Sequence, residues 1–147
     1  MHHIPKPVST RICIIRHGET DWNVEKRIQG HTDVPLNEVG RAQALAMAFN
    51  AAHQRFDAIY SSDLARTLET ARALAQREDQ EVKLLPQLRE RHYGVFQGIT
   101  AAQGAELYPA AYAHYVARDL DFDFETGESL RQFAERLRGY QVAGATA

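Results

Sequence analysis

Disulfides, membrane spans and an export signal are all missing from this sequence. It contains one cysteine, Cys13, so no disulfide can form within the chain, and a reducing cytoplasm is the expected compartment. No apolar run approaches the roughly 18 residues that a membrane span needs. The first residues also contain no apolar stretch of signal-peptide length. We therefore predict neither export nor a membrane partner.

An excess of charge of one sign is missing as well. The sequence has 17 basic and 19 acidic residues, a formal net charge of −2, and the two signs alternate along the chain. A nucleic-acid partner would call for a basic patch, so none is predicted. With 147 residues, one domain over residues 1–147 is the expected organisation.

The apolar residues that are present predict three strands. Residues 11–16 form a continuous β-branched block, which is typical of a parallel strand covered on both faces. Cys13 lies within this block and is expected to be a small core residue. Two further short strands are predicted over residues 57–60 and 82–85.

Helices are predicted between and after these strands. Asn37 can cap a helix over residues 38–53, and the expected core-facing stripe of this helix consists of Val39, Ala42, Ala46 and Phe49. A second helix follows 61–63, with an apolar side made of Leu64, Leu68, Ala71 and Ala75. A third begins after 127–129. This alternation predicts an α/β fold built on a parallel sheet.

The segment 86–126 has a less regular pattern. It is interrupted by glycine and proline and is rich in tyrosine. Such a segment is typical of a lid-like excursion over a site, and we expect no second core there.

Three residues that could handle phosphate each follow a predicted strand. His17 comes after the first strand, Arg66 lies in the first helical turn after the second, and Glu90 follows the third. Because the carboxyl ends of parallel strands meet at one edge of a sheet, the three are expected to lie together. An arginine and helix amides favour an anion, and a carboxyl can transfer protons. Taken singly, each has a simpler explanation: a surface turn histidine, a solvated helix arginine and a surface ion pair.

Several motifs together resemble the histidine phosphatase superfamily, in its phosphoglycerate mutase-like branch. In the family's order, the matching blocks are RHGET (16–20), WN (22–23), QGHTDVPLN (29–37), GRAQA (40–44), SSDLART (61–67), ERHYG (90–94) and GES (127–129). The resemblance covers most of the chain. It implies a three-layer helix/parallel-sheet/helix fold.

The resemblance also implies a mechanism. His17 would attack a phosphomonoester and become a phosphohistidine, while Arg16 and Arg66 hold the equatorial phosphoryl oxygens. Glu90 would protonate the leaving group and then activate water. Because the arginines would neutralise the transferred group, no metal or other cofactor is expected.

Further residues would line the phosphate pocket by the same resemblance. These are Asn23, Gln29 and Gly30, and the expected partner is a small phosphorylated metabolite. His17, Glu19, His31 and Asp33 also cluster in the sequence, but no pair has the spacing of a helical or knuckle-type metal motif.

One family feature has no match in the sequence. Relatives carry a second histidine in a His-Gly pair, after a strand that follows the last helix, whereas the last histidine here is His114. We therefore expect a C-terminally truncated fold. Loss of one transition-state donor of this kind costs about 2.7–4 kcal/mol. The missing strand would expose an apolar sheet edge through which copies could form a homo-oligomer.

Three functions remain open at this point. A phosphatase is favoured over a mutase because Ala101 stands where the mutases have a substrate-binding lysine. A module that binds a phospholigand without turnover is the third alternative.

Overall fold

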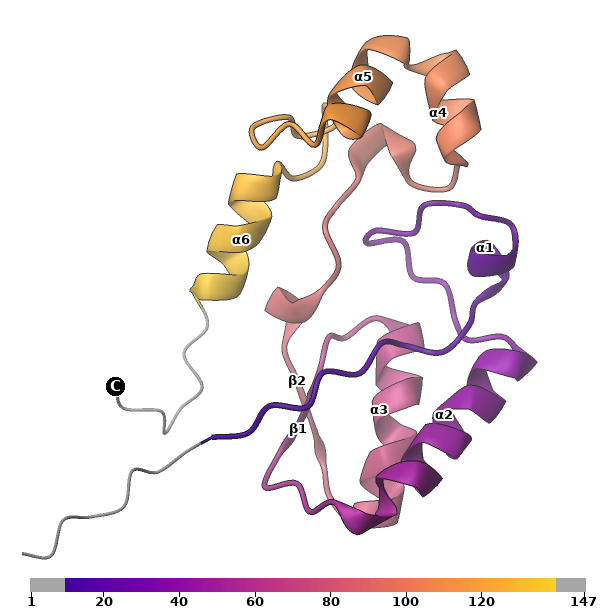
Figure 1. The fold of residues 1–147 in the computed structure, drawn as a ribbon, viewed down its shortest axis with the longest axis vertical. Coiled ribbons are helices and arrows are strands. Elements are labelled where there is room, and N and C mark those ends of the chain that lie inside the picture. Colours follow the sequence, from indigo (N-terminus) through magenta and orange to yellow (C-terminus); the bar gives the residue numbers. More distant parts are fainter. Residues whose placement is uncertain (1–9, 140–147) are drawn as a thin grey trace, which may run out of the picture.

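The computed structural model describes residues 10–139 and contains a βαβ unit (Figure 1). Strands β1 (Ile59–Ser61) and β2 (Val82–Leu84) pair in parallel, with their first residues opposite each other. Helix α3 (Ala65–Glu78) connects them and packs against both strands. The predicted α/β class and parallel pairing are therefore confirmed. No helix among these residues is long and apolar enough to cross a bilayer.

Helix α2 (Glu38–Asn50) packs on α3 and continues into a short 3-10 helix, η1 (Ala51–His53). It begins where predicted, because Asn37 Oδ1 accepts a hydrogen bond from the Gly40 N–H at 2.8 Å. The core between the helices and the sheet is formed by Ala48, Ile59, Leu74 and Ala75.

The core-facing side of α2 differs from the prediction. Its buried residues are Gly40, Ala44 and Ala48, whereas Phe49 is 74% exposed. The predicted stripe of Val39, Ala42, Ala46 and Phe49 lies on the exposed side. Close packing explains the reversal: a Cβ on Gly40 would lie 2.0 Å from the Glu19 carbonyl oxygen, so this contact selects the smallest side chains.

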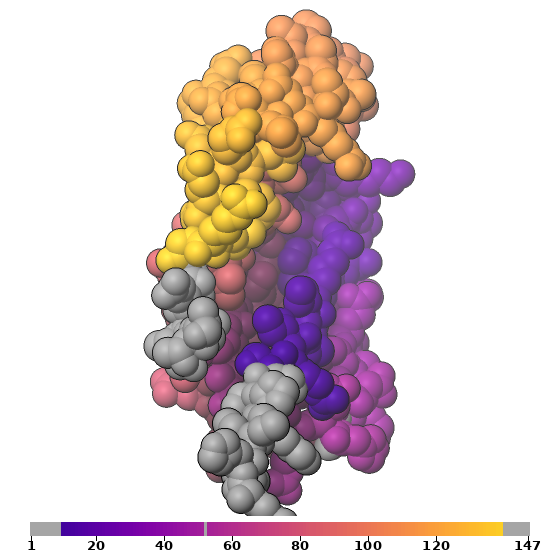
Figure 2. Space-filling model, turned by 60° about the vertical axis from the view of Figure 1, so that its left-hand side comes forward, coloured from indigo at the N-terminus to yellow at the C-terminus, as the bar shows by residue number. Residues whose placement is uncertain are grey.

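The predicted strand over residues 11–16 is absent from the structure. Ile12 is 79% exposed and Ile14 is 91% exposed, and the segment lies on the surface (Figure 2). Cys13 is exposed, so its predicted place in the core is also wrong. A strand requires a neighbour for its backbone hydrogen bonds, and nothing within residues 10–139 pairs with this segment.

The segment after β2 forms its own apolar cluster. It runs through four short helices: η2 (Pro86–Leu88), η3 (Gly94–Phe96), α4 (Ala101–Leu107) and α5 (Pro109–Ala117). Tyrosines and other apolar side chains pack around Phe96 and Phe124, which are both 0% exposed. The expectation that this segment carries no second core is therefore wrong.

Two further helices flank the site. Helix α1 (Asp21–Val24) is a single turn after the RHGET motif. Helix α6 (Leu130–Arg138) is capped by Ser129, in the predicted GES motif, and contacts η2 (Figure 1).

Candidate active site

His17 lies half-buried in the loop that leads to α1. The next residue anchors it, since the Gly18 N–H donates to Thr70 Oγ1 on α3 at 3.1 Å. A Cβ on Gly18 would lie 2.3 Å from the Gly40 carbonyl oxygen on α2, so only glycine fits there. Two helices thus hold the backbone beside His17.

The imidazole of His17 has a defined tautomer. Its Nδ1 lies 2.7 Å from the Gly18 carbonyl oxygen. A carbonyl oxygen only accepts, so Nδ1 carries the proton and donates it. The lone pair of Nε2 is therefore left for reaction with an electrophile.

Burial lowers the pKa of His17 below its ordinary value of 6.5. The positive charges of Arg66 and Arg16 lower this pKa further, whereas the Gly18 carbonyl and Glu90 act in the opposite direction. A neutral imidazole is the nucleophilic form, so this environment favours attack at neutral pH. The structure also brings Arg16, Arg66 and Glu90 within electrostatic range of His17, as the sequence predicted.

Arg66 is fixed inside the protein. Its side chain is 2% exposed, and its guanidinium donates to the carbonyl oxygens of Thr32 at 2.8 Å and Gly30 at 2.7 Å. Its Nε is buried and has no partner among the described residues. A buried, unpaired donor close to a histidine is suited to an anionic ligand.

Arg16 is held differently. It is exposed, and its guanidinium has no hydrogen bond to the described residues. Arg16 precedes His17 in the chain, and its positive charge lowers the pKa of His17. The guanidinium thus has its donors free for a ligand.

The predicted pocket residues lie in helix α1 and in the loop that follows it. Gln29 and Gly30 are buried, and Gln29 Oε1 has no partner among the described residues. Asn23 Oδ1 accepts a hydrogen bond from the Thr20 N–H at 3.0 Å, which leaves the amide nitrogen of Asn23 without a partner in this part of the chain. Helix α1 and the loop after it therefore both present polar atoms that a ligand could use.

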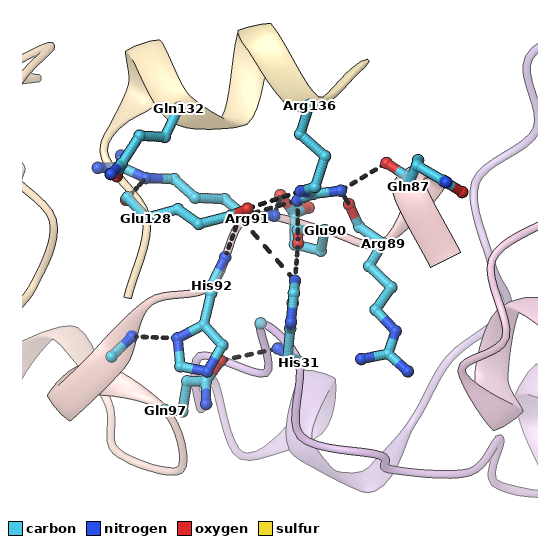
Figure 3. A network of polar contacts seen from close by, with 12 residues as sticks. His31, Gln87, Arg89, Glu90, Arg91, His92, Gln97, Glu128, Gln132 and Arg136 are labelled. Carbon is cyan, nitrogen blue, oxygen red and sulfur yellow. Dashed lines mark hydrogen bonds and ion pairs between the residues drawn. The ribbon is translucent and has the colours of Figure 1, made fainter. Parts of the chain in front are cut away.

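Glu90 is exposed, and its carboxylate accepts the N–H of Arg91 at 2.7 Å. Its backbone carbonyl oxygen accepts hydrogen bonds from His31 Nε2 at 2.7 Å and from Arg136 Nη2 at 3.2 Å (Figure 3). The backbone at Glu90 is thus held firmly, while the carboxylate has one hydrogen bond in the described structure.

Sequence reasoning missed the residues that support the site. Asp33 Oδ1 accepts from the Ala65 N–H at 2.7 Å and so caps α3, whose N-cap residue lacks a capping side chain. Thr70, which binds Gly18, could have been found from its place one turn after Arg66. No pattern pointed to Arg136.

The acidic and histidine side chains that cluster in the sequence have other partners in the structure. Glu19 accepts from the Asn37 amide, His31 binds the Glu90 carbonyl and Asp33 caps α3. Within residues 10–139 no three His, Cys, Asp or Glu side chains gather in a way that could hold a metal.

Comparison with known proteins decides the family. A model of the histidine phosphatase superfamily, branch 1, matches residues 12–141. The chain belongs to this superfamily. The matched range includes His17, Arg66 and Glu90.

Relatives in the histidine phosphatase superfamily have several names. The chain is 43% identical to a metal-independent phosphoserine phosphatase of Arabidopsis thaliana, covering 86% of this chain and 55% of the relative. It is 41% identical to a phosphoglycerate mutase-like protein 4 of the same plant, covering 85% and 56%. The structure of a mycobacterial glucosyl-3-phosphoglycerate phosphatase in complex with VO3 matches with a TM-score of 0.76 and 40% identity, covering 84% of this chain and 58% of that one. The chain thus spans a little over half the length of these proteins.

Proposed function

We propose that the chain hydrolyses small phosphomonoesters through a phosphohistidine on His17. The observation that carries this proposal is the state of the imidazole. His17 Nδ1 donates to the Gly18 carbonyl, which leaves the Nε2 lone pair for the electrophile, and the charges of Arg66, Arg16 and Glu90 act on the pKa of the ring. A nucleophile with an adjacent acid and two cations provides what covalent phosphoryl transfer requires.

The first step forms a bond between His17 Nε2 and phosphorus and breaks the bond from phosphorus to the ester oxygen. The departing oxygen takes a proton from the Glu90 carboxylic acid, and the arginines stabilise the charge on the phosphoryl oxygens. In the second step the Glu90 carboxylate removes a proton from water, whose oxygen attacks phosphorus. The P–N bond breaks, and phosphate and free His17 are released.

We infer a small phosphorylated metabolite as the substrate, because relatives carry the names phosphoserine phosphatase and glucosyl-3-phosphoglycerate phosphatase. Hydrolysis is preferred over a mutase reaction because Ala101 replaces the lysine expected of mutases. Incubation with 3-phosphoglycerate separates the two: a phosphatase releases inorganic phosphate, whereas a mutase yields the isomer. We place the enzyme in the cytoplasm because its single cysteine forms no internal disulfide.

Hydrolysis of p-nitrophenyl phosphate by the purified chain tests the proposal. We expect turnover that vanadate inhibits and that EDTA leaves unchanged. Loss of turnover in EDTA with recovery on adding zinc would overturn the metal-free mechanism. Binding of inorganic phosphate by folded protein without any turnover would instead assign a non-catalytic phospholigand-binding role.

We also propose that copies of the chain associate through the exposed apolar segment 12–15. Ile12 and Ile14 present large apolar surfaces there, which commonly mark contact sites. Sedimentation velocity should show a concentration-dependent dimer that Ile14→Thr weakens. A monomer at all concentrations contradicts this part of the proposal.

A further inference from the structure

A cluster of charged side chains surrounds the backbone carbonyl of Glu90 (Figure 3). Arg136, on α6, is its centre. The Arg136 guanidinium donates to the carbonyl oxygens of Gln87, Arg89 and Glu90, so one side chain binds nearly every residue of this short segment. The contacts connect α6 to the loop that carries Glu90, 46 residues earlier in the chain.

Glu128 holds Arg136 in place. Its two carboxylate oxygens accept from Arg136 Nε at 2.6 Å and from Nη2 at 2.8 Å, the two-pronged geometry in which arginine is most firmly oriented. The same carboxylate accepts the His92 N–H at 3.0 Å. Both side chains are mostly buried, with 18% of Glu128 and 20% of Arg136 exposed.

The charges of this pair persist at neutral pH. Burial alone would raise the pKa of Glu128, but the hydrogen bonds from Arg136 and the His92 amide outweigh it and lower the pKa. Glu128 is therefore ionised whenever the enzyme works, and Arg136 remains oriented.

A second donor reaches the Glu90 carbonyl from the loop that contains Gly30. His31 Nε2 donates to this oxygen at 2.7 Å, and its ring lies edge-on to His92 with the ring centres 4.8 Å apart. Arg136 and His31 thus both donate to the Glu90 backbone carbonyl. The exposed carboxylate has one hydrogen bond in the described structure, from the Arg91 N–H, so its position depends on these two contacts to the backbone.

We propose that Glu128 and Arg136 are positioning residues that hold Glu90 where it can protonate the leaving group. The inference rests on the proposed function, because it assigns the pair to the proton-transfer step. It also predicts more than a structural connection to α6. A connection alone would lower kcat/KM equally for all substrates, whereas misplacing the acid slows phosphohistidine formation, and so lowers kcat/KM, mainly for substrates with poor leaving groups.

The test compares two substrates in wild type, Arg136→Met and Glu90→Gln. For β-glycerophosphate, an ester with a poor leaving group, Arg136→Met should lower kcat/KM about 10- to 100-fold, which is less than most of the roughly 10²–10⁴ that a general acid contributes, because Glu90 is misplaced and not removed. For p-nitrophenyl phosphate the change should stay within about threefold, since nitrophenolate leaves without a proton. Adding Arg136→Met to Glu90→Gln should cause no further loss on the alkyl ester, because the acid that Arg136 positions is already absent.

Two controls sharpen the comparison. Arg131→Met removes an arginine from the same helix that pairs with Asp121 at the surface, and it should change neither rate. Glu128→Gln keeps the shape of the side chain and weakens its hold on Arg136. It should give a milder form of the same selective loss, and it serves as the test if Arg136→Met does not fold.

The outcomes are separable. If Glu90→Gln slows the alkyl ester selectively but Arg136→Met and Glu128→Gln do not, the positioning role is wrong and the phosphatase assignment stands. Equal losses on both substrates in either positioning variant also overturn it. If Glu90→Gln itself shows no selectivity, Glu90 is not the acid, and the inference fails together with that part of the proposed mechanism.

Discussion

The two arginines beside His17 are held by very different parts of the molecule. Arg66 sits in the first turn of α3, is 2% exposed and is bound by two loop carbonyls. Arg16 ends a surface segment that belongs to no strand, and its guanidinium has no hydrogen bond within the described chain. The Arg66 guanidinium is therefore fixed by the fold before any ligand binds, whereas the Arg16 guanidinium can change its position when a ligand binds.

This difference separates stability from activity. Pre-formed charge stabilises a transition state without reorganisation, but it requires buried hydrogen bonds that the fold cannot easily lose. A free arginine supplies charge that folding does not need. Substitutions at the two positions should therefore separate the two effects.

The largest effect is expected from Arg66→Met. The change removes the charge that we propose binds phosphate and leaves the Gly30 and Thr32 carbonyls without donors, so the free energy of unfolding should fall by roughly 2–4 kcal/mol. Activity on p-nitrophenyl phosphate should fall at least about 10³-fold. Urea unfolding and steady-state kinetics measure the two quantities. Arg72→Met, on the exposed side of the same helix, is the matched control and should change neither.

Arg16→Met should lower activity about 10²–10³-fold, the typical effect of losing one transition-state donor, and leave stability within about 0.5 kcal/mol. The exposed guanidinium has no contact that folding would lose. A loss of stability equal to that of Arg66→Met would show that the amino-terminal segment is packed after all.

The contrast also shows which features a sequence can predict. The apolar side of α3 was predicted in part: Leu64 and Ala75 are buried and Leu68 and Ala71 are half-buried, but the buried Leu74 was not in the predicted set. The stripe of α2 was reversed. Periodicity locates two faces of an alanine-rich helix, and only the close contact at Gly40 selects between them.

The site was predicted at the level of motifs. The sequence predicted that His17, Arg66 and Glu90 lie together, and in the structure Arg66 and Glu90 are close enough to affect the pKa of His17. Their supports were not predicted, because the acceptors of Arg66 are main-chain carbonyls that carry no sequence signal. The segment 11–16 has the composition of a strand, but strand formation depends on a partner for its backbone and not on composition alone.

A smaller effect is expected from Thr70→Val, which tests the buried bond between the two sides of the site. The change removes the acceptor of the Gly18 N–H while keeping the shape of the side chain. Leaving this N–H unpaired should lower the free energy of unfolding by about 1–3 kcal/mol. Thr67→Val is the control, because the Thr67 hydroxyl bonds to Ser62 and to the Leu64 carbonyl and has no hydrogen bond to Gly18. Equal small losses would show that Gly18 is held by packing alone.

The smallest effect concerns pH. Because the pKa of His17 is lowered from 6.5 in the folded chain, the midpoint of the acidic decline in kcat/KM, where His17 becomes protonated, should lie below pH 6.5. Arg16→Met should move this decline to higher pH, since one of the charges that lower the pKa is gone. Added salt should act in the same direction by screening the exposed Arg16. A midpoint of the decline above pH 6.5 in wild type contradicts the lowered pKa.

The stability of the fold should change over the same range. The unfolded chain binds a proton at His17 near pH 6.5 and the folded chain only at lower pH, so stability falls as pH drops from 6.5 through the folded pKa. In His17→Asn this part of the loss should disappear, as urea unfolding at several pH values would show.

The covalent intermediate is the most direct test of the central claim. Rapid mixing of the chain with a ³²P-labelled phosphomonoester, followed by quenching in alkali, should trap label on the protein that is stable to base and released by acid. Peptide mapping should place it on His17, and His17→Ala should show neither label nor turnover while keeping its fold. Turnover retained in His17→Ala, or label on another residue, would contradict the account.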